Sequence, residues 1–263
     1  MPRFAANLTT MFTEIDISRR FDAASEVGFR AVELLSPYSS DIRDLRGWLS
    51  AAGVEMILLN TSPGNGAAGE RGLAAVPGRE DDFKATFDQA LTYATGLDVG
   101  MIHVMAGIAG DDGVAAADAK FVENLAWASS LARPEGIRLM IEPLNTRDVP
   151  GYLLTSSDHA ARLLTELGDD NVRMQYDFYH MQVMEGDLGM TMKRRLDLIG
   201  HMQFSSVPGR NEPQYGEINL SHLFDLVDQL GYRGWMGCEY RPKTSTLEGL
   251  SWGESYGLRA PTY

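Results

Sequence analysis

The sequence predicts a (β/α)8 TIM barrel that forms a single domain over residues 1–263. The first observation is a recurring unit, made of a helix-like segment, a glycine and a short apolar run. Each run is continuously apolar, as expected for a strand covered on both faces. The second observation is the helical period of the segments between the runs. Eight strands alternating with helices in 263 residues indicate a barrel, with a doubly wound open sheet as the alternative.

The strands follow one another along the chain with a glycine before most of them. The first is expected in RFAANL (3–8). The other seven are expected in EVGFRAVEL, AAGVEMILLN, ATGLDVGMIHVMAG, PEGIRLMIEPL, LGDDNVRMQYD, IGHMQFSS and LGYRGWMGCEY, with their glycines at 28, 53, 96, 136, 168, 200 and 231. Glycine is the usual residue after a helix C-terminus because it accepts a positive φ at no steric cost. Two of the intervening helices show one apolar face each, comprising Phe83, Phe87, Leu91 and Ala94, and Leu223, Phe224, Val227 and Leu230.

One long irregular segment interrupts this alternation of strands and helices after the third strand. It reads TSPGNGAAGERGLAAVPG (61–78). A loop of this length inside a compact domain is usually functional, and we expect a lid over the site. A passive surface insertion is the alternative. No linker or low-complexity segment divides the chain.

An excess of acidic residues limits the partners. With 23 Lys and Arg against 36 Asp and Glu, the formal net charge is −13, which argues against nucleic acid or an anionic membrane surface. The single cysteine, Cys238, cannot form an internal disulfide and fits a reducing compartment. The sequence shows neither the apolar core of a signal peptide nor a membrane span, so we expect a cytoplasmic protein. A homo-oligomer is compatible with the fold, but no pattern indicates its symmetry.

Polar residues stand at the end of every expected strand. In a (β/α)8 barrel the active site lies at the C-terminal ends of the strands. These residues are Asn7, Glu33, Asn60, His103, Glu142, Asp177, Gln203 and Glu239. The last four would bring three carboxylates and an amide oxygen to one mouth, where they would repel one another without a cation. Oxygen ligands suit a hard divalent ion, so we expect Mg²⁺ or Mn²⁺ on Glu142, Asp177, Gln203 and Glu239; salt-bridged carboxylates are the alternative.

Other residues are candidates for substrate contact. His180 follows Asp177 by three positions, and Arg210 in the loop VPGRNEP could clamp a substrate carboxylate. His103 and Asn60 at strand ends, and Glu70 in the long loop, are further candidates. Cys238 adjoins Glu239, but strand alternation turns it toward the helices, which favours packing. Two short matches occur, GNGAAG (64–69) to G-x-G-x-x-G and GLSWG (249–253) to G-x-S-x-G, but neither forms a direct turn from an expected strand into a helix. The sequence contains no P-loop and no Cys/His zinc spacing.

Over nearly its whole length the chain resembles the hydroxypyruvate isomerase family of xylose-isomerase-like barrels. The matching segments are RFAANL (3–8), AAGERGLAAVPGRE (67–80), IHVMAG (102–107), IEPLN with PGY (141–152), QYDFYHMQVMEGDL (175–188), GRNEP with GEIN (209–219) and GWMGCEY (234–240). The resemblance implies metal ligation by Glu142, Asp177, Gln203 and Glu239. It also implies that Glu142 and Glu239 form the acid/base pair and that His180 and Arg210 contact the substrate.

The segment after Gln203 departs from the pattern of the family. It reads FSSVPGRNEP where the resemblance leads us to expect IADNPGRHEP or a close variant, so Ser206, Val207 and Asn211 are different. These changes spare the expected metal site and bear on the identity of the substrate. The start of the chain and IHVMAG are similar to 2-oxo-tetronate isomerases, whereas QYDFYHMQ and PGY are more similar to hydroxypyruvate isomerase.

The expected reaction is therefore an aldose–ketose isomerisation of a small hydroxy-keto acid, hydroxypyruvate to tartronate semialdehyde. A 2-oxo-tetronate isomerase and a ketose 3-epimerase are alternatives, although the resemblance implies a histidine at the position of Gln203 for the epimerases. An endonuclease on the same barrel would need several zinc ligands and a basic face, which the 5 His and the net charge of −13 do not favour. A barrel that binds a sugar or acid without catalysis is a further alternative.

Overall fold

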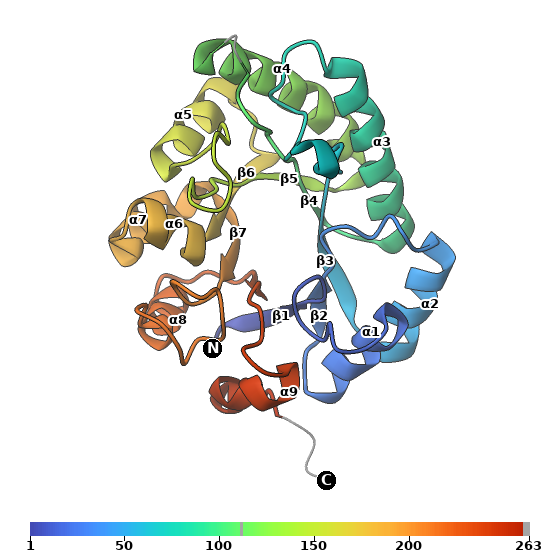
Figure 1. Ribbon diagram of the computed structural model, residues 1–263, viewed down its shortest axis with the longest axis vertical. Coiled ribbons are helices and arrows are strands. Elements are labelled where there is room, and N and C mark those ends of the chain that lie inside the picture. The colour runs from blue at the N-terminus through green and yellow to red at the C-terminus, as the bar shows by residue number, and fades with distance from the viewer. Residues whose placement is uncertain (111–112, 260–263) are drawn as a thin grey trace.

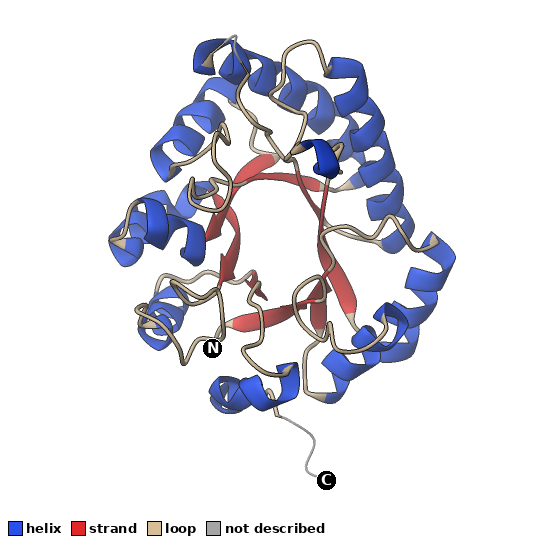
Figure 2. Ribbon diagram, in the orientation of Figure 1, coloured by secondary structure: helices blue, strands red, loops and turns tan. Residues whose placement is uncertain are grey.

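The computed structural model describes residues 1–110 and 113–259 and shows a closed barrel of parallel strands in the order β1 to β8 (Figure 1). The predicted (β/α)8 architecture is confirmed, and Figure 2 shows the helices outside the ring of strands. The strands are β1 (Arg3–Asn7), β2 (Ala31–Glu33), β3 (Glu55–Asn60), β4 (Met101–His103), β5 (Arg138–Ile141), β6 (Val172–Asp177), β7 (Ile199–Phe204) and β8 (Trp235–Cys238).

Helices lie on the outside of the barrel, between successive strands and, for the last of them, after β8. They are α1 (Ile17–Glu26), α2 (Ile42–Ala52), α3 (Glu80–Leu97), α4 (Val114–Ala132), α5 (Ser157–Leu167), α6 (Phe178–Met184), α7 (Leu188–Arg195), α8 (Leu220–Gln229) and α9 (Thr246–Gly249). Short 3₁₀ turns are η1 (Gly66–Ala68), η2 (Arg133–Glu135), η3 (Leu196–Leu198) and η4 (Leu250–Tyr256). None of the helices within the described residues has the length and apolar character needed to cross a membrane.

The recurring glycines mark helix ends at some positions and close packing at others. Gly53 and Gly168 follow α2 and α5 in the left-handed conformation, as predicted. Gly96 instead lies inside α3, whose last residue is Leu97 and whose C-cap is Asp98 with φ 58°. A Cβ on Gly96 would come within 2.9 Å of Ile42 on α2, so this glycine permits close helix packing. Gly200 lies inside β7, where a Cβ would stand 2.6 Å from the Cβ of Arg173.

The N-terminal and C-terminal strands pair with each other and share a core. Residues Arg3 to Ala6 of β1 are in register with Trp235 to Cys238 of β8. Phe4 lies in edge-to-face contact with Trp252 of η4 and with Phe224 of α8, at centroid distances of 5.1 and 5.0 Å. Aromatic pairs in this geometry stabilise beyond the area they bury. The closure of the barrel is thus held by hydrogen bonds inside and by aromatic rings outside.

The long loop at 61–78 is packed rather than extended into solvent. Its residues 73–75 are buried, and Gly72 forms an isolated bridge with Ala106 after β4. Glu70 pairs with Arg79 and accepts from the backbone N–H of Asn65. The loop therefore joins the ends of β3 and β4, and its motion as a lid stays a prediction.

Candidate metal centre and active site

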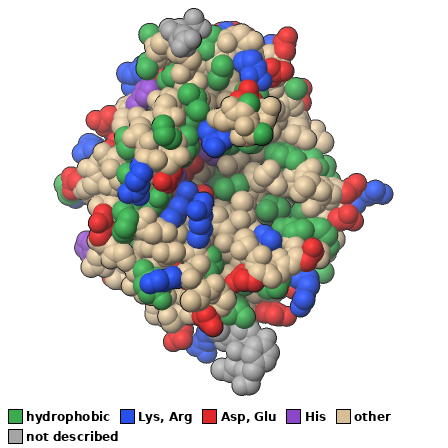
Figure 3. All heavy atoms as spheres, viewed as in Figure 1, with side chains coloured by type: hydrophobic (Ala, Val, Ile, Leu, Met, Phe, Trp, Pro, Cys, Tyr) green, Lys and Arg blue, Asp and Glu red, His purple; other side chains and the backbone are tan. Residues whose placement is uncertain are grey.

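Consecutive strands carry the four predicted metal ligands to one end of the barrel. Glu142 directly follows β5, Asp177 is the last residue of β6, Gln203 lies in β7 and Glu239 directly follows β8. Asp177 and Gln203 are in register across β6 and β7. All four side chains are buried. The hollow near the centre of the face in Figure 3 has both acidic and basic side chains around it.

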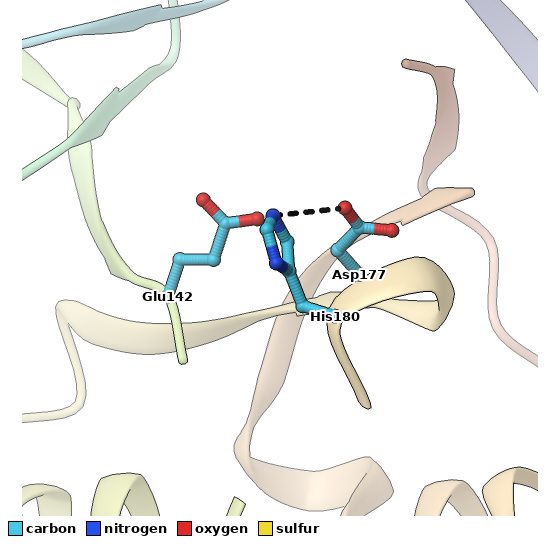
Figure 4. A group of neighbouring side chains, drawn as sticks. All are labelled: Glu142, Asp177 and His180. Carbon is cyan, nitrogen blue, oxygen red and sulfur yellow. Dashed lines mark ion pairs between the residues drawn. The ribbon is translucent and has the colours of Figure 1, made fainter. Parts of the chain in front are cut away.

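Two of these carboxylates and one imidazole form a compact group that could hold a metal ion. One ligand atom from each of Glu142, Asp177 and His180 lies within 4.8 Å of the others, and Figure 4 shows the three side chains pointing toward one another. Glu142 Oε1 and Asp177 Oδ2 are buried without a hydrogen-bond partner. A divalent cation would satisfy such orphaned oxygens. The two carboxylates of this group therefore fit a hard metal ion.

Local hydrogen bonds determine what the imidazole of His180 can do. Its Nδ1 accepts from the backbone N–H of Asn145 at 3.0 Å. Burial, with Arg210 nearby, lowers the pKa of His180 well below its usual value, so the ring is neutral. A neutral imidazole whose Nδ1 accepts must carry its proton on Nε2. Nε2 lies 3.6 Å from Asp177 Oδ2, so His180 presents an N–H donor to the site and is better suited to substrate contact than to metal ligation.

Arg210 supplies positive charge at the same mouth. Its guanidinium donates to Glu239 Oε1 at 2.7 Å and lies 3.7 Å from Asp177 Oδ2. It also stacks over the ring of Tyr179 at 4.8 Å. Arg210 adopts φ 54°, an uncommon conformation for a residue other than glycine. Its side chain, only 18% exposed, therefore faces the carboxylates from a strained loop position.

Burial and mutual repulsion raise the pKa of each carboxyl group in this site. For Glu142, burial followed by repulsion from Glu239 and Asp177 raises the pKa well above its usual value. Burial raises the pKa of Asp177 to about 6 and that of Glu239 to about 7, although Arg210 opposes both shifts. Groups that titrate near neutral pH suit proton transfer. A divalent cation bound among them would favour the ionised forms.

Three further residues are predicted to contact the substrate, His103, Asn60 and Glu70. His103 Nδ1 is 3.5 Å from Glu142 Oε2, and burial lowers the pKa of His103 to about 3. Asn60 ends β3, and its Oδ1 is buried without a partner. The carboxylate of Glu70 is engaged within the long loop by Arg79 and Asn65. Their contacts with a substrate stay predictions.

Sequence reasoning missed part of the polar interior. Gln175 donates to Gln203 Oε1 at 2.6 Å, and His201 Nε2 lies 2.6 Å from Glu33 Oε1. The signal was available in the alternation of strands, because residues two apart face the same side. His201 stands two residues before Gln203, and Gln175 two residues before Asp177. Cys238 is buried in the main core cluster, as the same alternation predicts.

Comparison with known proteins agrees with this geometry. The family model described as "Xylose isomerase-like TIM barrel" matches residues 21–256. A 2-oxo-tetronate isomerase of Cupriavidus necator is 49% identical, covering 97% of this chain and 99% of that protein. A hydroxypyruvate isomerase of Escherichia coli is 42% identical, covering 97% and 100%. A crystal structure named as an AP endonuclease, family 2, from Brucella melitensis has a TM-score of 0.95 at 43% identity, covering 97% and 99%. The chain therefore belongs to the xylose isomerase-like TIM-barrel family.

Proposed function

We propose that this protein is a metal-dependent aldose–ketose isomerase that converts hydroxypyruvate to tartronate semialdehyde (2-hydroxy-3-oxopropanoate). The observation that carries the proposal is the set of buried carboxylates at the ends of β5, β6 and β8, together with Arg210. Relatives that span nearly the whole chain are named as isomerases of hydroxypyruvate or of 2-oxo-tetronate. These names support an isomerase of a small keto acid.

Glu142, Asp177, Gln203 and Glu239 would hold the ion, with Mg²⁺ or Mn²⁺ suited to their oxygen atoms. When bound, a divalent ion polarises the substrate carbonyl and stabilises negative charge on its oxygens. The unpartnered Glu142 Oε1 and Asp177 Oδ2 support this placement. Gln203 Oε1 now accepts from Gln175, and the exchange of that hydrogen bond would free it for ligation.

The side chains around this position fit the proton transfers of an isomerisation. One of Glu142 and Glu239 would remove a proton from the hydroxymethyl carbon (C3) of hydroxypyruvate, which gives an enediolate. The other would deliver a proton to the neighbouring carbon (C2), while the hydroxyl proton moves from the C3 oxygen to the C2 oxygen. The raised pKa values of both carboxyls make them competent bases and acids near neutral pH.

Arg210 and His180 would hold the substrate for this transfer. The guanidinium of Arg210 can pair with the substrate carboxylate, which offsets the net charge of −13 on the chain. The Nε2–H of His180 can donate to a substrate oxygen, since its Nδ1 is bound by Asn145. The loop at 61–78 would limit access of water to the enediolate if it closes.

A 2-oxo-tetronate isomerase is the second candidate, favoured by the relative from Cupriavidus necator at 49% identity. Ser206, Val207 and Asn211, which depart from the hydroxypyruvate isomerase pattern, lie in the loop after β7 that also carries Arg210. A nuclease role receives less support, although one similar structure carries that name. The three-residue group with Glu142 contains a single histidine within the described part of the chain, and the net charge of −13 opposes DNA binding.

The test uses purified protein that is stripped of metal and then supplied with Mg²⁺ or Mn²⁺. Hydroxypyruvate and a four-carbon 2-oxo-tetronate are given in parallel in D₂O, and exchange of the substrate proton is followed by NMR. Exchange and isomerised product from the three-carbon acid support the proposal. Preference for the four-carbon acid moves the protein to the second candidate with the same mechanism. Exchange with neither substrate would contradict both assignments.

A further inference from the structure

A buried polar cluster lies inside the barrel next to the predicted metal ligands. We call Asn7, Glu33, Gln175, His201 and Gln203 the interior polar cluster; all five are at most 1% exposed. Glu33 Oε2 accepts from the side-chain amides of Asn7 at 2.9 Å and Gln203 at 2.8 Å. Glu33 Oε1 lies 2.6 Å from His201 Nε2. A carboxylate this deeply buried persists only when such partners surround it.

The chemistry of Glu33 determines the orientation of its neighbours. A carboxylate offers acceptor oxygens, and an amide can meet such an oxygen only through its NH₂ group, as Gln203 does here at 2.8 Å. The amide of Gln203 therefore turns its NH₂ group toward Glu33, and its oxygen must face the opposite way. There the oxygen meets the Gln175 amide at 2.6 Å. Gln203 stands in register with Asp177 of β6, so its amide lies beside the predicted ligands, and the oxygen is the end of the amide that does not face Glu33.

The backbone around Glu33 is shaped to admit its carboxylate. Gly237 of β8 is in register with Gln203 of β7. A Cβ on Gly237 would overlap both carboxylate oxygens of Glu33. Below the cluster, Ala5 and Ala31 stand two residues before Asn7 and Glu33 and begin an apolar layer with Leu58 and Met140. The carboxylate thus lies against Gly237, between this apolar layer and Gln203.

We propose that Glu33 is a positioning residue that fixes the amide of Gln203 with its oxygen toward the metal. Without an acceptor-only partner, the amide of Gln203 could rotate by half a turn and present NH₂ to a cation, which is repulsive. This inference rests on the proposed function, because it assigns Gln203 as an oxygen ligand. It adds a residue from β2, a strand that supplies none of the predicted ligands.

The test is a double-mutant cycle on metal affinity, with Mn²⁺ binding measured by titration calorimetry. The four proteins are the wild type, Glu33→Gln, Gln203→Ala and the double variant. The change Glu33→Gln keeps the shape of the side chain but supplies an amide that can donate as well as accept. We expect Glu33→Gln to weaken Mn²⁺ binding by about 10–100-fold, the range typical of residues that orient a ligand. In the Gln203→Ala background the same change should not weaken Mn²⁺ binding further. Glu185→Gln is the matched control, since it makes the same change at a carboxylate outside the interior polar cluster, which accepts from Ser157, and it should keep the wild-type affinity.

Two outcomes would overturn the inference. Wild-type affinity in Glu33→Gln is one. The other is an equal loss in both backgrounds, which would assign the effect to the charge of Glu33. If the wild type itself binds no Mn²⁺, the proposed function fails and the inference fails with it. Should Glu33→Gln not fold, a wild-type NMR titration with Mg²⁺ decides. The side-chain carbonyl carbon of Gln203 should shift while its NH₂ stays hydrogen-bonded, and an unchanged carbonyl would refute the assignment.

Discussion

Acid should weaken metal binding steeply, because protons and the metal compete for the same carboxylates. Burial raises the pKa of Asp177 to about 6 and that of Glu239 to about 7. Treated as independent sites with these values, both groups are ionised in about 90% of molecules at pH 8 and in roughly 1% at pH 5.5. The apparent affinity for Mn²⁺ should therefore fall by about 100-fold over this range. The raised pKa of Glu142 adds to the effect.

Titration calorimetry with Mn²⁺ at pH 8, 6.5 and 5.5 measures this dependence. Near pH 6.5 the two carboxyls together hold about one proton, so about one proton should be released per ion bound. The release is read from the difference in heat between two buffers of unlike ionisation enthalpy. The Glu239→Gln variant lacks the group that titrates near pH 7. Because Asp177 alone then titrates, the apparent affinity for Mn²⁺ should fall only about fourfold between pH 8 and 5.5. Equal affinities at pH 8 and 5.5, without proton release, would refute the ligation of the metal by these carboxylates.

Three further predictions concern catalysis, protonation and stability. Glu142→Gln should abolish turnover of the isomerised substrate while circular dichroism shows an intact fold, and near-wild-type turnover would remove the acid/base role. Nitrogen NMR of the imidazoles should find His180 neutral with its proton on Nε2 between pH 5.5 and 8; a proton on Nδ1 would contradict the hydrogen bonding described above. Gly237→Ala should lower the melting temperature because the new methyl group meets the Glu33 carboxylate. In Gly47→Ala in α2 the new methyl group meets no atom within 4 Å, so this variant should leave the free energy of unfolding unchanged or raise it by about 0.5–1 kcal/mol. Equal melting temperatures for the two variants would show that the interior has room for Gly237→Ala.

The fold was predictable from sequence because a parallel barrel requires apolar strand segments and helix ends that recur regularly along the sequence. Strands covered on both faces read as continuous apolar runs, and several glycines end the helices between them. Gly96 and Gly200 show the limit of that signal. Glycine is also required where two backbones approach closely, and a single sequence does not distinguish a helix end from a packing contact. The sequence therefore predicted that α3 ends before Gly96, whereas the helix continues to Leu97 and Asp98 takes the left-handed conformation.

The end of the barrel at which the four predicted ligands lie was predictable from sequence, but their contacts were not. Strand ends placed Glu142, Asp177, Gln203 and Glu239 together because parallel strands all end on one face. The hydrogen bond from the Asn145 backbone to His180 depends on the path of a loop, which no periodic pattern describes. Likewise, the pairing of Glu33 with His201 joins residues 168 positions apart. Such contacts arise from the closure of the barrel as a whole.

The pairing of β1 with β8 has a consequence for the order of events during synthesis. The partners of the first strand, from Trp235 to Cys238, are made about 230 residues after it. At about 5–20 residues per second, a growing chain leaves one edge of β1 without its neighbour for roughly 12–46 s. An unpaired parallel edge can recruit other chains. Until Trp235 to Cys238 have been made, that edge of β1 has no neighbour in the chain, so the barrel can close only when the last tenth of the chain is synthesised.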